Sequence, residues 1–546
     1  MTNSISRSKV PEQDVAQALA DRLIKALPAG TNVSVELLTE AYRSVLRGAT
    51  CARLTEEELE ALLGEGFQKV LAAAAKDSHG AESPLVIAND IDGAVTKSLI
   101  YLRAMDEAEE ELRDMIMEVC QHREIPWPYD LAAPYLKFLA LDQGKSRGKL
   151  PALEKLSRRR FVVLTGGPGT GKTYALKAFL WLALGAGKIE PGRIQLMAPT
   201  NRAARVMSEV VDKTIVQAGV VDQRFAELLR GIPRATTIHR MLGERDALKK
   251  AELVVVDEAS MVDLNLFRKL LEGIDRTKAT LLIIGDPNQL PSVDIGSVLL
   301  DISNPKVGFF ESTVARLHGS ERSNPEIVEV AEAVNEGKFE VLEAHGHRHE
   351  LELVKVVAEA TSEAGPFIKI RELSSARQEG WETKALALTK GLKVLCSHRS
   401  GPQGSVALSE KVMKKLGLTS SDDDGAIIMV TRNDPAQGVV NGEIGVVADG
   451  RAYFSAGEDE FRSLALSELP DYELAYASTI HKAQGGEYDR VIIVIGKSEQ
   501  EAFLSRELLY TAITRAKTSY DVYGSKDAIN ALKPVQRASG LAARLR

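Results

Sequence analysis

Cysteine is scarce in this sequence, and long apolar runs are missing from it. The three cysteines, Cys51, Cys120 and Cys396, stand far apart in no metal-ligand spacing, which predicts reduced, partly buried thiols. No apolar run approaches the roughly 20 residues that span a bilayer. The first 14 residues have no apolar core of the kind found in a signal peptide. We therefore expect a cytoplasmic protein without a membrane partner.

An excess of positive charge is missing as well. The net charge is −7, so the whole chain carries no basic signature for nucleic acid, although a basic cleft can exist under an acidic exterior. The hydrophobic fraction of 44% and the charged fraction of 27% are ordinary for a globular protein. With 546 residues and roughly 100–200 residues per domain, three or four domains are expected.

Residues 1–125 are predicted to form a mostly helical domain. An apolar residue recurs every fourth position at Val15, Leu19, Leu23 and Leu27, as on one helical face. Thr55 and Glu58 form a capping-box pattern, which predicts that a helix starts at Thr55. No catalytic constellation occurs here. The domain is therefore either a packing unit or a docking module for a partner.

From Arg160 onward, short apolar runs alternate with helical stretches. Such runs occur at Phe161–Leu164, Ile194–Met197, Leu253–Val256 and Leu281–Ile284, and later at Val394–Cys396 and Val491–Ile495. Continuous apolar runs are typical of parallel strands buried on both faces, and their alternation with helices predicts a doubly wound α/β fold. We expect one lobe over residues 150–340 and a second over 341–546. Residues 426–454 are short-stranded and punctuated by glycine, which predicts a small β insertion at about residues 426–474.

A glycine-rich loop follows the first of these runs and opens a helix, the context that a phosphate-binding P-loop requires. The loop consists of Gly166, Gly167, Pro168, Gly169, Thr170, Gly171, Lys172 and Thr173. Its glycines let backbone N–H groups approach phosphate oxygens, and the helix N-terminus adds a favourable dipole. Lys172 is expected to reach the β- and γ-phosphates of ATP, and the Thr173 hydroxyl to bind Mg²⁺.

Polar residues follow two later strands. Asp257 and Glu258 end the run Leu253–Val256, at the edge of an open α/β sheet where ligands bind. Asp257 is expected to hold Mg²⁺ through water, and Glu258 to orient and deprotonate the attacking water. Gln289 follows the next strand and is a candidate sensor of the γ-phosphate, because an amide can both donate and accept hydrogen bonds.

The ordered motifs resemble those of superfamily 1 helicases, and most closely the RecD family. The matching runs are GGPGTGKT (166–173), APTNRAA (198–204), TTIHRMLG (236–243), VVVDEASMVD (254–263), GDPNQLPSVDIGSVL (285–299), TRNDPAQGVVNGEIG (431–445), STIHKAQGGEYD (478–489) and LLYTAITRAK (508–517). The resemblance covers about residues 161–524. A looser match lies in the N-terminal region, in the run PLVIAND…SLIYLRAMDEAEEEL.

The resemblance implies two RecA-like P-loop NTPase lobes with ATP and Mg²⁺ between them and an SH3-like insertion in the second lobe. It assigns Arg322 and Arg515 to the positive charge that stabilises phosphoryl transfer, with Arg515 contributed by the second lobe. It also implies an ATP-dependent DNA helicase that moves 5′ to 3′ on single-stranded DNA. The chain departs from the family pattern upstream of the P-loop, where Lys149 stands near the position of a glutamine that reads adenine.

By the same resemblance, single-stranded DNA is expected to contact six polar residues: Thr200, Thr237, His239, Asn441, Thr479 and His481. Hydroxyls and imidazoles suit backbone phosphates, although for each residue alone a structural role such as a helix cap is an equal alternative. The implied partners are duplex-end DNA and RecB-like and RecC-like subunits in a heterotrimer, exodeoxyribonuclease V. The chain shows no nuclease motif, so another subunit is expected to cut. A stand-alone DNA or RNA helicase and a nucleotide-gated regulatory subunit are the alternatives.

Overall fold

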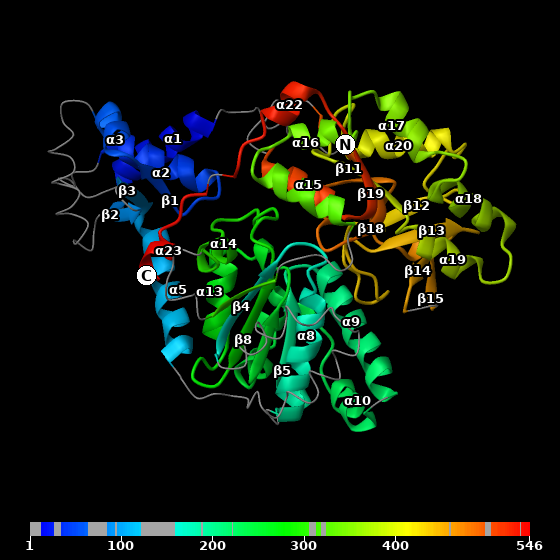
Figure 1. Ribbon diagram of the computed structural model, residues 1–546, viewed down its shortest axis with the longest axis horizontal. Helices are drawn as coiled ribbons and strands as arrows, with labels where there is room; N and C mark the ends of the chain where they lie inside the picture. Colours follow the sequence, from blue (N-terminus) through cyan, green and yellow to red (C-terminus); the bar gives the residue numbers. More distant parts are fainter. Residues whose placement is uncertain are drawn as a thin grey trace.

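The computed structural model describes residues 12–26, 34–63, 85–92, 95–121, 159–186, 189–220, 222–304, 313–317, 324–457, 460–496, 504–535 and 537–545. Within these ranges, two parallel sheets, a five-stranded antiparallel sheet and a three-stranded antiparallel sheet form the framework of the protein (Figure 1). No helix in the described part of the chain is both long enough and apolar enough to cross a membrane.

The first lobe contains a six-stranded parallel sheet in the order β6-β5-β7-β8-β4-β9. Its strands are β4 (Phe161–Gly166), β5 (Ile194–Ala198), β6 (Thr236–Thr237), β7 (Leu253–Val256), β8 (Thr280–Gly285) and β9 (Val314–Leu317). Val162 and Leu164 of β4 pack on one face, and Phe161 and Val163 on the other. The predicted run of apolar residues is therefore explained by burial on both faces.

Helices cover both faces of this sheet. One face packs against α8 (Lys172–Trp181), α9 (Asn201–Gly219) and α10 (Gln223–Arg230). The other face packs against α11 (Ile238–Gly243), α13 (Leu264–Gly273) and α14 (Val298–Ile302). This is the doubly wound α/β arrangement that the sequence predicts.

The second lobe contains a five-stranded parallel sheet in the order β10-β19-β18-β11-β17. Its strands are β10 (Arg348–His349), β11 (Leu392–Cys396), β17 (Ala477–Thr479), β18 (Tyr488–Val494) and β19 (Ala516–Tyr523), and helix α21 (Arg506–Ile513) packs against it. Helix α15 (Pro325–Asn335) also packs into this core, although the boundary predicted at residue 340 would place it with the first lobe. The domain boundaries remain predictions.

The antiparallel sheet lies within the predicted insertion. It has the order β15-β14-β13-β12-β16, with β12 (Ile427–Val430), β13 (Ile444–Ala448), β14 (Arg451–Ser455), β15 (Phe461–Ala465) and β16 (Tyr472–Leu474). The SH3-like identity of this sheet remains a prediction.

The N-terminal region combines helices with a small sheet in the order β1-β3-β2. Its elements are α1 (Glu12–Ala26), α2 (Val35–Leu46), β1 (Cys51–Leu54), α3 (Glu56–Leu63), β2 (Leu85–Asp92), β3 (Val95–Leu102) and α5 (Arg103–Gln121). The capping box is present, because the Glu58 carboxylate accepts from the Thr55 backbone N–H at 2.7 Å and the Thr55 hydroxyl accepts from the Glu58 N–H at 3.2 Å.

Helix α5 and the C-terminal helix α23 (Leu541–Arg544) lie side by side against the first lobe (Figure 1). Both contribute to the core that contains β4, β7 and β8. The fully buried Glu109 of α5 accepts hydrogen bonds from Ser539 Oγ at 2.8 Å and from Arg544 Nε at 3.3 Å. The last helix of the N-terminal region and the C-terminal helix are thus joined on the first lobe by apolar packing and a buried charge.

Candidate nucleotide and DNA site

The P-loop leaves the carboxyl end of β4 and turns into α8. Gly169 and Gly171 have φ angles of +69° and +93°, which favour glycine because a Cβ is strained there. A Cβ on Gly166 would lie 2.5 Å from the Thr170 hydroxyl oxygen. Glycine therefore lets the loop pack closely and leaves its N–H groups free to surround an anion.

Lys172 begins α8, whose N-terminal dipole favours a phosphate. The Lys172 ammonium donates to the carbonyl oxygens of Gly166 at 2.6 Å and Gly167 at 2.9 Å. These bonds hold the ammonium over the loop. The adjacent Thr173 is partly exposed, and its hydroxyl and the carboxylate of Asp257 are the hard oxygen donors that Mg²⁺ prefers.

Asp257 and Glu258 follow β7, two strands from β4 in the same parallel sheet. Burial, and then the charge of Glu258, raise the pKa of Asp257 to about 6, against the opposing effects of the Glu258 backbone N–H and the Lys172 ammonium. Glu258 has a φ of +53°, a backbone angle that is unfavourable for residues other than glycine. Such strain is typical of functional positions whose side-chain direction is imposed by the fold.

Gln289 follows β8, which lies between β7 and β4. It is only 4% exposed, and its Nε2 donates to Asp286 Oδ2 at 3.2 Å. The hydroxyl of Tyr510, from α21 of the second lobe, donates to the same oxygen at 2.9 Å. The P-loop, the acidic pair and Gln289 therefore lie at one edge of the sheet, at the carboxyl ends of the neighbouring strands β4, β7 and β8.

The two predicted arginines have different outcomes. Arg515 is 4% exposed and follows α21, and it donates to the carbonyl oxygens of Thr511 at 3.1 Å and Gly486 at 3.3 Å. These acceptors belong to the second lobe, so the fold holds the guanidinium in place from its own side. Arg322 lies outside the described residues, as does Lys149.

The predicted DNA residues of the first lobe follow the remaining strands of the same edge. Thr200 follows β5 and Thr237 ends β6, which pair in parallel. Each hydroxyl caps a helix, accepting from the N–H of Ala203 or Arg240 at 3.2 Å. The capping role is therefore real, but it uses only the acceptor capacity of each hydroxyl and leaves its proton for a phosphate.

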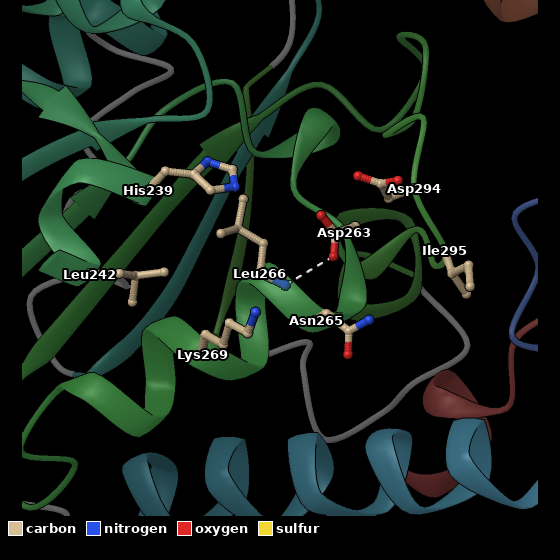
Figure 2. A pocket seen from close by; sticks show the side chains of 8 residues that line it. All are labelled: His239, Leu242, Asp263, Asn265, Leu266, Lys269, Asp294 and Ile295. Carbon is tan, nitrogen blue, oxygen red and sulfur yellow. Dashed lines mark hydrogen bonds between the residues drawn. The ribbon is translucent and has the colours of Figure 1, made fainter.

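His239 is exposed and lines a cavity of about 290 Å³ (Figure 2). Figure 2 shows His239 on one side of this cavity and Asp294 on the other, with Lys269 and Asp263 between them. Asp263 caps α13 by accepting from Leu266 N–H at 2.9 Å. The open position of His239 is compatible with contact to a phosphate, and nothing in the packing requires an imidazole there.

The predicted DNA residues of the second lobe are Asn441, Thr479 and His481. Asn441 N–H donates to Asn433 Oδ1 at 2.8 Å, and Asn201 Nδ2 donates to the same oxygen at 3.2 Å. Asn201 adjoins Thr200, so the structure brings Asn441 close to the first lobe. Thr479 ends β17 at the edge of the second sheet, and burial lowers the pKa of the neighbouring His481.

An ion-pair cluster that sequence reasoning missed joins α9 to the small antiparallel sheet. The nearly buried carboxylate of Glu443 contacts Arg205 of α9 and Arg462 of β15, each at 2.7 Å. The residues Tyr510 and Asp286 were also missed, although both lie within motifs quoted above. The members of the pairs Arg205–Glu443 and Tyr510–Asp286 are more than 200 positions apart. No spacing in the sequence could therefore have revealed these two contacts.

Comparison with known proteins agrees with this arrangement. Residues 150–355 match the family model described as an AAA domain, and residues 474–520 match the UvrD-like helicase C-terminal domain. The RecBCD enzyme subunit RecD of Mycolicibacterium smegmatis is 36% identical over 411 residues, which cover 70% of this chain and 72% of that protein.

Two other proteins are similar over comparable stretches of this chain. The ATP-dependent RecD2 DNA helicase of Deinococcus radiodurans is 30% identical, over 71% of this chain and 50% of its own length. A solved structure of Bacteroides Pif1 bound to single-stranded DNA is 19% identical, with a TM-score of 0.41, over 70% of this chain and 93% of that one. On the extent and identity of the match to the mycobacterial protein, this chain belongs to the RecD family of ATP-dependent DNA helicases.

Proposed function

We propose that this chain is the motor subunit of a RecBCD-type complex and that it moves 5′ to 3′ along single-stranded DNA, driven by ATP and Mg²⁺ bound between its two lobes. One observation carries the motor part of the proposal. The P-loop, the acidic pair and Gln289 lie at neighbouring strand ends of one sheet, and the second lobe contacts this edge through Tyr510. Motion of the lobes and chemistry at the edge are then mechanically connected.

The P-loop supplies phosphate binding in this proposal. Lys172 exchanges its two loop carbonyls for the β- and γ-phosphates. Thr173 and Asp257 would hold Mg²⁺, whose charge would stabilise the transferred phosphoryl group. Glu258, whose position is imposed by a left-handed backbone, orients and deprotonates the attacking water. These roles need hard oxygen donors and one carboxylate base, which the edge provides.

Gln289 and Arg515 complete the site. Gln289 senses the γ-phosphate through its amide, and Arg515 supplies positive charge from the second lobe to the transition state. Hydrolysis then depends on how the lobes are arranged. Arg322 retains its proposed place in the same role by resemblance to the family.

Six residues are proposed to contact the DNA backbone: Thr200, Thr237, His239, Asn441, Thr479 and His481. Support comes from the arrangement of the sheet edge. Thr200 and Thr237 follow β5 and β6, which lie beyond β7 from the nucleotide strands, so nucleotide and DNA occupy different halves of one edge. Contacts to phosphates rather than bases suit a motor that must pass every sequence.

The motor is tested by replacing Lys172 with glutamine. DNA-stimulated ATP hydrolysis is expected to fall at least about 100-fold, because an ammonium that stabilises the transition state is lost, while the thermal unfolding midpoint stays within about 2 °C. Lys177→Gln is the matched control, since Lys177 lies on the same helix and bonds to Gln217 on the protein surface. Hydrolysis near the wild-type rate in Lys172→Gln would refute the proposed site.

The direction of movement is tested with partial duplexes that carry a single-stranded tail at one end. By resemblance to the family, we expect unwinding of duplexes with a 5′ tail. Unwinding restricted to 3′-tailed duplexes would refute this polarity. The same assay with Glu258→Gln, which removes the proposed base, distinguishes unwinding from passive strand capture.

RecB-like and RecC-like subunits are the proposed partners. This chain is 36% identical to the RecBCD subunit RecD of Mycolicibacterium smegmatis and 30% identical to the RecD2 helicase of Deinococcus radiodurans, and the higher identity favours the complex over the stand-alone alternative. Native mass measurement after mild purification from the source cells tests the proposal. A heterotrimer is expected, and recovery of the chain only as an active monomer would favour the stand-alone helicase.

A further inference from the structure

The oxygen Asp286 Oδ2 lies at a junction between the two lobes. It accepts one hydrogen bond from Tyr510 of the second lobe at 2.9 Å and one from Gln289 of the first lobe at 3.2 Å. All three side chains are buried. Burial and the charge of Asp286 raise the pKa of Tyr510 well above its ordinary value, so the phenol keeps its proton and donates throughout the physiological range.

The amide of Gln289 is only half satisfied. Its Nε2 faces a carboxylate, which fixes the orientation of the amide because the reverse would place two oxygens together. Its Oε1 is buried and accepts no hydrogen bond from the described residues. The Nε2 group carries two N–H donors, and its bond to Asp286 uses one of them. The bond to Asp286 therefore sets the direction of the second N–H, and the amide turns away from its present position only by breaking that bond.

Tyr510 also lies beside the phosphate loop. A Cβ built on Gly167 would lie 3.3 Å from the Tyr510 hydroxyl oxygen. The next residue of α21, Thr511, contacts the segment 286–290 of the first lobe. Its Oγ1 accepts a hydrogen bond from the Leu290 backbone N–H at 2.9 Å. Gln484 Nε2 donates to the Leu290 carbonyl oxygen at 3.3 Å. The segment 286–290 is thus held by the second lobe at both of its ends.

We propose that Tyr510 is a positioning residue that couples the second lobe to the phosphate sensor by sharing Asp286 with Gln289. When Gln289 turns to the γ-phosphate, Tyr510 keeps the buried carboxylate oxygen paired. When the lobes separate, Tyr510 leaves and Gln289 becomes the remaining side-chain donor to that oxygen, which holds it away from the nucleotide. This inference rests on the proposed sensing role of Gln289.

The test is Tyr510→Phe in the full chain, which keeps the ring and removes the shared hydrogen bond. The maximal DNA-stimulated rate of ATP hydrolysis is expected to fall about tenfold, the effect of one hydrogen bond to a buried charge. The KM for ATP is expected to change less than about twofold, because the bond matters after ATP has bound. An unchanged maximal rate would overturn the inference.

Tyr520→Phe is the matched control. The Tyr520 hydroxyl in β19 is also buried in the second lobe but has no hydrogen-bond partner among the described residues. Its removal is expected to leave the maximal rate within twofold of the wild-type rate. A tenfold loss in this variant as well would show that any buried phenol of the lobe has the effect, and would overturn the specific role of Tyr510.

Coupling through Gln289 is tested by combining substitutions. In a Gln289→Ala background, Tyr510→Phe should lower the maximal rate less than twofold further, because the group that it positions is absent. A further tenfold loss there would show that Tyr510 acts otherwise and would overturn the inference. Asp286→Asn, which disturbs the same junction from the first lobe, should likewise be non-additive with Tyr510→Phe.

Failure of the sensor and failure of the coupling give different results. If Gln289→Ala alone keeps the wild-type rate, the proposed sensing role is wrong and the inference falls with it. If Gln289→Ala is impaired while Tyr510→Phe is not, the sensor stands and only the coupling is refuted.

Discussion

Replacing Asp257 with asparagine is expected to stabilise the first lobe above neutral pH while it abolishes ATP hydrolysis. Burial and the charge of Glu258 raise the pKa of Asp257 from 3.8 to about 6. A carboxyl group whose pKa is higher in the folded chain than in the unfolded chain stabilises the fold most at low pH. This contribution is lost as the pH rises through the folded value. Asparagine carries no charge at any pH and avoids the loss.

The magnitude follows from the two pKa values. At about 1.36 kcal/mol for each pH unit between them, burying the charge costs about 3 kcal/mol. Asp257 keeps partial contact with solvent, so the expected gain in the asparagine variant at pH 8 is about 2 kcal/mol. The Glu258 backbone N–H, which donates to Asp257 Oδ1 at 2.8 Å, finds an equivalent acceptor in the asparagine carbonyl.

Hydrogen exchange of the β4, β7 and β8 amides measures this gain, because it reports the local free energy of opening in a multidomain chain. Wild type and Asp257→Asn are compared at pH 4.5 and pH 8 without Mg²⁺ or nucleotide. The difference should grow with pH. A variant that is less stable at pH 8, or a difference independent of pH, would refute the reasoning. Asp212→Asn, on the surface of α9, is expected to change stability by less than about 0.5 kcal/mol.

Three other results are expected. ATP hydrolysis by the wild type should fall as the pH drops through about 6, because protonation removes the charge of Asp257, the proposed Mg²⁺ ligand. A higher Mg²⁺ concentration should move this fall to lower pH. A flat rate profile between pH 7 and 5 would contradict the proposed role. Glu109→Ala should cost about 3 kcal/mol, because the Arg544 guanidinium loses its buried carboxylate partner. The same substitution should speed tryptic cleavage after Arg537, and unchanged cleavage would argue against the anchoring. Glu443→Gln should weaken the contact of α9 with the small antiparallel sheet, because the ion pair with Arg205 becomes a neutral hydrogen bond. The amides of β13 and β14 should then exchange faster. Exchange at the wild-type rate would count against this role of Glu443.

The sequence by itself determined the strands of the first lobe, one helix start in the N-terminal region, and the family. The apolar runs at 161–164, 194–197, 253–256 and 281–284 all became buried parallel strands, because burial on both faces leaves a continuous apolar pattern that needs no knowledge of neighbours. The capping box at Thr55 formed as predicted, since its partners are three residues apart. The ordered motifs identified the family, because each is a short run whose residue types serve one ligand.

His345, His347 and His349 lie in a polar stretch that the sequence predicts to be an exposed linker rather than a metal site, since alternate histidines without cysteines are a weak metal signature. His345 and His347 contact Glu326 at 3.1 and 2.8 Å, and His349 lies in β10, which extends the second sheet. The strand β10 could not be predicted from this stretch, because a two-residue strand gains its stability from a distant neighbour, β19, rather than from its own pattern.

Only the tertiary structure decided how the lobes connect. The pairs Tyr510–Asp286, Arg205–Glu443 and Glu109–Arg544 join residues that are more than 200 positions apart. Each is a contact between side chains of types that occur many times in the chain, so neither composition nor spacing singles it out. Such pairs form where burial removes water and makes an unpaired polar group costly. That condition is set by the packing of whole elements, which is why the connection between Gln289 and the second lobe emerges only from the fold.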